Sequence, residues 1–213
     1  MDFQQQQNMH QNIETGPVTP QMNHGGHEMF DVHEVLAGSI NTMNTYTMLS
    51  QHVQDPELRD ILDRQKAFMK QEYNTTLECF QTGQDPAVPT KSYKMKQGND
   101  FTYGMKPGGQ PKKPMESTAE INDETIALSM LNAVKSVAPI KTSAAMEATN
   151  PVVRRVLADS LPNCIEMAYE ISLYQNKKGY YQVPQLVQQD MQQLQNGYAQ
   201  ASINSQMPGN STH

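Results

Sequence analysis

Apolar side chains recur at steps of three, four and seven residues in the first part of the chain, which is the spacing of one helix face. The pattern predicts a helix over residues 28–54 and a second helix directly after it. Between them, Asp55 is a good N-cap and Pro56 suits the first helical position. Gly83 is placed to end the second helix. Because so short a turn forces neighbouring helices to run antiparallel, we expect a helical hairpin over residues 27–83.

The helical pattern returns in the second half of the chain after a long irregular stretch. Residues 84–116 contain several Pro and Gly and no sustained apolar spacing. At about 3.3 Å per residue, such a segment can return along the whole length of a helix. A third helix is expected to begin near Ser117, with Glu120 completing a capping box. A second cap and proline, Asn150 and Pro151, predict the start of a fourth helix.

The two hairpins carry a repeated motif. Residues 55–62 match residues 150–157 in their cap, proline and core positions, and Pro56 and Pro151 stand 95 residues apart. The match indicates a duplicated hairpin, unless it reflects only the caps that any hairpin uses. Two hairpins joined by one long crossover are typical of ferritin-like bundles. We therefore predict an all-α, ferritin-like four-helix bundle made of two repeated helical hairpins, with the second hairpin over residues 117–184.

The segments that flank the predicted bundle are polar. Residues 1–26 are rich in Gln, Asn and Met and are predicted to form a disordered tail. Residues 185–213 are predicted to form a short amphipathic helix followed by a polar tail. Hydrophobic residues make up 37% of the chain and the mean hydropathy is −0.68, which agrees with a partly unfolded chain.

The charge balance bears on the classes of partner. The formal net charge is −6, which argues against nucleic acid and anionic membranes, because both attract concentrated Lys and Arg. No apolar run approaches the length of a membrane span, and residues 1–7 lack the pattern of a signal peptide. We therefore expect no nucleic-acid partner and no membrane insertion.

A ferritin-like fold raises the question of a metal centre. A di-metal site in such a bundle takes one Glu from each of two helices and a Glu-x-x-His pair from each of the others. No Glu here is followed by His three residues later, and the third helix has no carboxylate between Glu124 and Glu147. The sequence therefore predicts no bundle-centre metal and no cofactor. At the start of the first helix, His27, Asp31 and Glu34 share one face, which suits either a transition metal or a solvated acidic turn.

Residues for catalysis are not evident. Cys79 and Cys164 fall within apolar helical patterns, where a thiol is more often buried than nucleophilic. No Gly-rich phosphate loop follows a strand pattern. We therefore predict no catalytic residues and a non-enzymatic protein.

The second hairpin resembles a known family. Asn150-Pro151-Val152-Val153-Arg154, a helix of about 28 residues and then Gly179-Tyr180-Tyr181-Gln182-Val183 are similar to the Coat F domain of spore coat protein F from endospore-forming, Bacillus-type bacteria. In that family an N-P-x-hydrophobic-R helix start precedes a G-[WY]-Y ending. The resemblance covers about residues 121–184. The first hairpin keeps Asp55-Pro56-Glu57-Leu58-Arg59, but Gln84-Asp85-Pro86 stands where the aromatic ending would be.

The resemblance implies a ferritin-like fold, a structural role in the spore coat and no catalytic residues. It also implies synthesis in the mother-cell cytoplasm, followed by deposition on the forespore. We therefore expect a non-enzymatic coat component that contacts other spore coat proteins or further copies of itself. Two alternatives stay open: a ferritin-like metal-binding or redox protein with a non-standard ligand set, and an adaptor that recruits a partner to the coat.

Overall fold

The computed structural model describes residues 23–108 and 110–202. Within these ranges the chain is helical and contains no strand, apart from one isolated bridge between Tyr103 and Val183. Most of the predicted N-terminal tail and the last residues of the predicted C-terminal tail lie outside the described residues. The helices, with one 3₁₀ turn, η2, are α2 (Gly26–Ser50), α3 (Pro56–Thr82), η2 (Thr118–Glu120), α4 (Asp123–Glu147), α5 (Pro151–Lys178) and α6 (Gln188–Gln195).

The predicted caps of the second and fourth helices are confirmed, whereas the first helix ends at Ser50, four residues before its predicted end. The Asp55 carboxylate accepts a hydrogen bond from the Glu57 amide, and α3 begins at the proline that follows Asp55. The Asn150 side chain accepts from the amides of the second and third residues of α5, which also begins at a proline. Gly83 and Gly179 end α3 and α5 with φ of 64° and 76°. Glycine adopts this left-handed conformation without the steric cost of a Cβ.

The predicted start of the third helix is wrong by six residues. Helix α4 begins at Asp123, and the residues after Ser117 form only the single turn η2. The capping box lies at Asn122, whose side chain accepts from the Thr125 amide while the Thr125 hydroxyl accepts from the Asn122 amide. Glu120 instead accepts from the amide of Glu116. A Ser with Glu three residues later thus predicted the wrong cap, because Asn and Thr make the same exchange further along.

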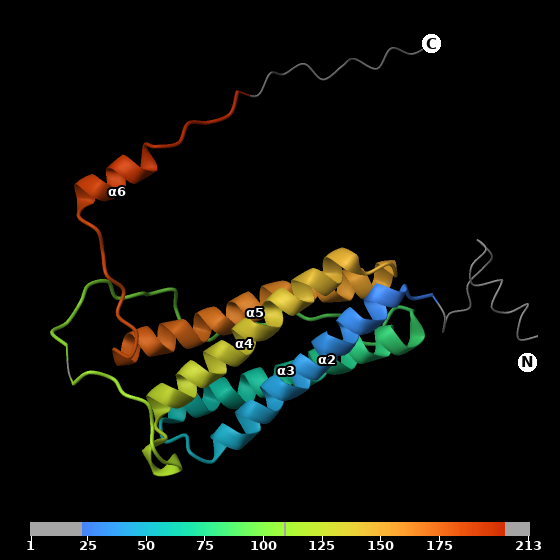
Figure 1. The fold of residues 1–213 in the computed structure, drawn as a ribbon, viewed down its shortest axis with the longest axis horizontal. Helices are drawn as coiled ribbons and strands as arrows, with labels where there is room; N and C mark the ends of the chain where they lie inside the picture. The colour runs from blue at the N-terminus through green and yellow to red at the C-terminus, as the bar shows by residue number, and fades with distance from the viewer. Residues whose placement is uncertain (1–22, 109, 203–213) are drawn as a thin grey trace, which may run out of the picture.

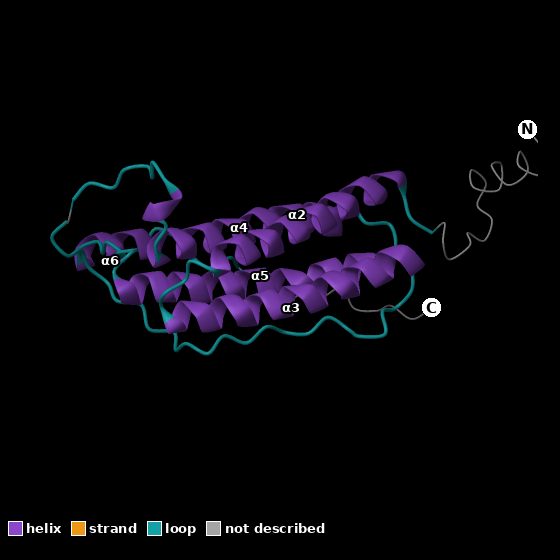
Figure 2. Cartoon of the chain, turned by 90° about the horizontal axis from the view of Figure 1, so that it is seen from below, coloured by secondary structure: helices purple, strands orange, loops and turns teal. Residues whose placement is uncertain are grey.

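The four long helices pack side by side in two layers, α2 with α4 and α3 with α5 (Figure 2). In Figure 1, α3 and α4 both run from left to right, whereas α2 and α5 run the opposite way. The second and third long helices are therefore parallel, as the long crossover predicts. A core cluster towards the α2–α3 turn draws on all four helices: Tyr46, Leu58, Ile61, Leu62, Ile126, Met130, Met167, Ile171 and Tyr174. A second cluster near the α4–α5 turn includes Val32, Val35, Cys79, Ala144, Val153 and Leu157.

The crossover follows the α3–α5 layer back along the molecule (Figure 2). The Asn163 amide nitrogen donates to the Lys91 carbonyl at 2.9 Å, and its oxygen accepts from the Tyr93 amide at 2.8 Å. The Asn176 side chain makes the same two-way contact with the backbone of Thr102, at 2.7 and 3.0 Å. Two asparagines of α5 thus hold the irregular segment against the helices.

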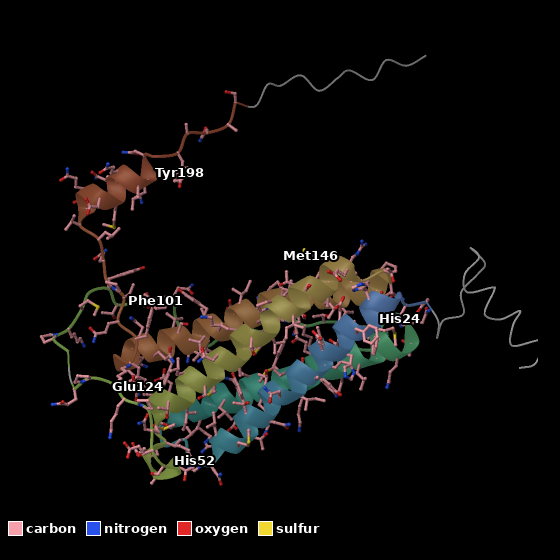
Figure 3. All side chains as sticks on the ribbon, viewed as in Figure 1. His24, His52, Phe101, Glu124, Met146 and Tyr198 are labelled. Atoms are coloured by element: carbon pink, nitrogen blue, oxygen red, sulfur yellow. The ribbon has the colours of Figure 1, made fainter. Side chains whose placement is uncertain are left out.

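Helix α6 stands apart from the packed helices (Figure 1). None of its residues is buried, and Tyr198, just beyond it, is 90% exposed (Figure 3). Among the described residues, no helix has the length and apolar character needed to cross a membrane.

Candidate functional site

A buried carboxylate, Glu28, ties the start of α2 to the turn between α4 and α5. Its Oε2 accepts hydrogen bonds from the Thr149 amide at 2.6 Å, the Thr149 hydroxyl at 2.8 Å and the Asn150 amide at 2.8 Å. Its Oε1 contacts Nδ1 of His24, which lies against the end of α3 (Figure 3). Burial opposes the charge, but these donors outweigh it and lower the pKa of Glu28. We call this arrangement the Glu28 clamp.

The sequence placed His24 in a disordered tail, and the structure places it in the folded body. Its ring lies 5.5 Å from that of Phe80, and Asn23 donates to the carbonyl of Gly83. The folded part therefore begins at least three residues before α2. No local pattern predicts this, because Phe80 and Gly83, against which His24 and Asn23 lie, are distant from them in the chain.

Beside the Glu28 clamp, the structure brings together two of the three predicted metal ligands. His27 and Asp31 meet Glu147, the last residue of α4, with one donor atom of each within 4.8 Å of the others. Nδ1 of His27 is 3.4 Å from Oε2 of Glu147. Glu34 is exposed and does not belong to the group. Sequence reasoning missed Glu147 because it lies 116 residues after Asp31 and on another helix.

A second buried carboxylate, Glu170 of α5, organises a polar network near the middle of the helices. Its Oε1 accepts from Arg64 Nη2 at 2.7 Å, and its Oε2 accepts from Gln65 Nε2 at 3.0 Å and from the Tyr93 hydroxyl at 2.5 Å. The Gln65 oxygen in turn accepts from the Tyr46 hydroxyl at 2.7 Å. These five residues, which we call the Glu170 network, join α2, α3, α5 and the crossover.

The charges within the Glu170 network stabilise one another. Burial disfavours the Arg64 cation, but hydrogen bonds to Glu170 and Asp60 raise its pKa above the ordinary value. Burial raises the pKa of Tyr93, and its bond to Glu170 adds to the shift, so this phenol stays protonated and donates. The network therefore holds a fixed set of donors and acceptors.

A third buried acid, Glu72 of α3, is paired with a lysine. Lys141 Nζ lies 2.6 Å from Glu72 Oε2, and Asn163 Nδ2 donates to Oε1 at 2.9 Å. Burial works against the ammonium, but Glu72 outweighs it and raises the pKa of Lys141. The pair borders a cavity of about 20 Å³, room for one water molecule. We call Glu72 and Lys141 the buried ion pair.

The buried acids between the helices differ from the ligands of a di-metal centre, because they already have cationic partners. Each of the two mid-helix acids, Glu72 and Glu170, is already neutralised by a cation of the chain, Lys141 or Arg64. In the sequence, such buried charged residues are marked by their position in the helical repeat and not by their residue type. Lys141 lies in register with Val134 and Ala144, so it falls on the buried face even though it is charged.

The two cysteines are buried, as their apolar surroundings in the sequence predict. Burial raises the pKa of Cys79 to about 12 and raises that of Cys164. Because the thiolate is the reactive form, neither thiol is activated for nucleophilic attack.

The outer face of α4 and α5 carries an open apolar groove. Leu131, Ala138, Ile165 and Ala168 line it, together with Met146, and the exposed lining is mostly apolar. Met146, labelled in Figure 3, is 77% exposed, and Ile165 is 68% exposed. The groove thus presents exposed apolar side chains of two neighbouring helices at the surface. We call it the α4–α5 groove.

Comparison with known proteins gives two matches. A family model for the Coat F domain matches residues 122–184, which agrees with the range of the resemblance seen in the sequence. The spore coat protein F-like protein YhcQ of Bacillus subtilis strain 168 is 51% identical over 205 residues, which cover 96% of this chain and 92% of that protein. No solved structure matches the chain.

Proposed function

Since the chain belongs to the spore coat protein F family, we propose that it is a non-enzymatic structural component of the bacterial spore coat that acts through protein–protein contacts. The observation that carries this proposal is the 51% identity to a spore coat protein F-like protein along nearly the whole chain. The location is the spore coat. We infer synthesis in the mother-cell cytoplasm before deposition on the forespore.

The structure supports a structural role rather than a catalytic one. The buried carboxylates of Glu28, Glu72 and Glu170 are each neutralised or hydrogen-bonded within the chain, and the two buried thiols are not activated. Such satisfied networks rigidify a core and specify one packing. The same pairing weighs against the alternative of a redox centre between the helices, because the acids that would bind metal already hold Lys141 and Arg64.

We further propose that the fold is a ferritin-like four-helix bundle built from two repeated hairpins. Parallel α3 and α4, joined by the long crossover, support this connectivity. The proposed units are the hairpins over residues 27–83 and 117–184, the crossover over 84–116 and a C-terminal extension over 185–213.

The α4–α5 groove is the proposed contact surface, with other coat proteins or further copies of this chain as partners. Its side chains are apolar and exposed, and Val187, which precedes α6, and Leu194 of α6 are further exposed apolar residues. Burying such surface contributes about 25 cal/mol per Å². An adaptor that recruits a partner to the coat would use the same groove.

The test is fractionation of sporulating cells that produce the full chain at its native level. We expect an antibody to this chain to detect it in the coat extract of purified spores. A variant with Met146→Asp and Ile165→Asp should stay in the mother-cell soluble fraction, because charged side chains in the groove oppose burial. Met48→Asp, at an exposed position of α2, is the control and should enter the coat.

Two results would contradict the proposal at different levels. Absence of the parent chain from purified spores would overturn the coat assignment itself. Normal deposition of the groove variant would leave the coat assignment in place and overturn the contact surface.

A further inference from the structure

Three metal-ligand side chains meet where α2 begins and α4 ends. His27 and Asp31 stand one turn apart on α2, and Glu147 closes α4. Donor atoms of the three lie within 4.8 Å of one another. We propose that His27, Asp31 and Glu147 form a binding site for one divalent transition-metal ion, which links the two helices. This site is independent of the proposed coat role.

An independent feature of Asp31 points to a missing partner. Its Oδ2 is shielded from solvent, yet it accepts no hydrogen bond from any residue in the described ranges. A buried carboxylate oxygen without a donor is costly, and a cation placed between it and its neighbours removes that cost. The neighbours include Glu147, a second carboxylate, so the cation also relieves repulsion between like charges.

The end of α4 favours a cation for a further reason. The C-terminus of a helix carries a partial negative charge, which Lys, Arg or a bound cation stabilises. The last turn of α4 contains no basic residue, and Glu147 adds a full negative charge there. A metal ion at Glu147 therefore takes the place that a basic side chain occupies at the end of α5, where Lys177 and Lys178 lie.

The donor set selects the class of ion. One imidazole and two carboxylates suit Zn²⁺ and similar transition metals, whereas Mg²⁺ and Ca²⁺ prefer oxygen ligands alone. Tetrahedral bonds of about 2.0–2.2 Å place donor atoms about 3.3–3.6 Å apart. His27 Nδ1 and Glu147 Oε2 are already 3.4 Å apart, and the Asp31 donor atom, which lies within 4.8 Å of both, moves closer when the site closes. Water completes the coordination.

The site differs from the set that the α2 sequence alone suggests. Glu34 lies on the same helix as His27 and Asp31, but it does not join their group. Glu34 is therefore the matched control: it has the same charge as Glu147, lies near the site and is exposed. Glu34→Gln and Glu147→Gln each remove one negative charge, so they separate coordination from general electrostatic attraction.

The experiment measures Zn²⁺ binding by calorimetry, using the full, untagged chain freed of metal. We expect one ion per chain at this site, with Kd at least about tenfold weaker in Glu147→Gln, Asp31→Asn and His27→Ala. Kd in Glu34→Gln should stay within about twofold of the parent value. A hundredfold excess of Mg²⁺ should leave binding unchanged. Circular dichroism without metal should give the same helix content and a cooperative melting transition for the parent and all variants, which excludes misfolding as the cause.

Because the bound ion would join α2 to α4, thermal stability is a second measurement of the site. Zn²⁺ at about a hundred times its Kd should raise the Tm of the parent by about 5–10 °C, and should raise that of Glu147→Gln by much less. The proposal is overturned if Glu147→Gln binds Zn²⁺ as tightly as the parent. It is also overturned if Glu34→Gln weakens binding as much as Glu147→Gln does, because the ligands would then lie on α2 alone.

Discussion

Replacing Lys141 with Met tests the buried ion pair. In the parent protein the Lys141 ammonium lies 2.6 Å from the Glu72 carboxylate, with both side chains almost wholly shielded from solvent. Lys141→Met keeps the apolar stem and removes the charge. The Glu72 carboxylate then stays buried, with Asn163 as its remaining side-chain donor.

The expected loss is large because one charge is left without its partner. Removing one member of a buried ion pair costs about 3–5 kcal/mol, against a total free energy of unfolding of about 5–15 kcal/mol. Replacing both members with apolar residues is often nearly neutral, so Glu72→Met combined with Lys141→Met should recover most of the loss. The coupling between the two sites, rather than either single value, measures the interaction.

Urea unfolding followed by circular dichroism at pH 7 measures these changes. The midpoint should fall by about 1–2 M in Lys141→Met and return towards the parent value in the double variant. Lys135→Met, at an exposed position on the same helix, is the control and should change stability by less than about 0.5 kcal/mol. A cost below about 1 kcal/mol for Lys141→Met would refute the reasoning, because it would mean that water reaches Glu72.

The buried ion pair also predicts the direction in which the free energy of unfolding changes with pH. Glu72 raises the pKa of Lys141 in the folded state, although burial opposes this. A raised pKa contributes stability that is fully present below the unfolded value and is lost as pH rises through the folded value. We therefore expect the parent to lose this contribution only in the alkaline range, above the ordinary lysine pKa of 10.5. Lys141→Met should lack that alkaline component.

Three further predictions concern the caps and the other two polar clusters. Asn150→Ala should cost about 0.5–2 kcal/mol in urea unfolding, because it removes the α5 cap and a bond to the Gly83 carbonyl; an unchanged midpoint would mean that the cap does not contribute. Tyr46→Phe should cost about 1–3 kcal/mol in thermal unfolding, because the buried Gln65 oxygen loses its donor; a neutral result would mean that another donor replaces the phenol. The lowered pKa of Glu28 contributes stability that is present above the ordinary value of 4.5 and is lost as pH falls through the folded pKa. Below about pH 4.5, the Tm of Glu28→Gln should therefore depend less on pH than the Tm of the parent does. Equal slopes of Tm against pH would contradict this.

The helix ends that the sequence predicted correctly are those fixed by local chemistry. A cap followed by proline at Asp55 and Asn150, and glycine after the last turn at Gly83 and Gly179, act within a few residues. The start of α4 was wrong because Ser117 and Asn122 both satisfy the local rule. Tertiary packing selects between them, and a sequence window does not contain that information.

The polar clusters could be predicted only in part. His27 and Asp31 share a helix face and were found from their spacing, whereas Glu147 reaches them only through the packing of α4 against α2. Glu72 and Lys141 lie at buried positions of their helices, but because they are charged they were not counted among the apolar positions of the helical repeat. Periodicity weighted by residue type alone therefore overlooks charged residues that neutralise each other across helices.

The crossover also affects how the two halves of the chain are held together. Every described side chain from residue 102 to residue 120 is exposed, so the covalent link between the halves lies almost entirely at the surface. Asn163 holds the earlier part of the same segment at Lys91, and Asn176 holds the start of the exposed stretch at Thr102. Both asparagines belong to the other half. With the packing of α2 on α4 and α3 on α5, these bonds would keep two fragments assembled after cleavage at the exposed stretch. The peptide link there sets the effective concentration of the halves, while complementary surfaces set their arrangement.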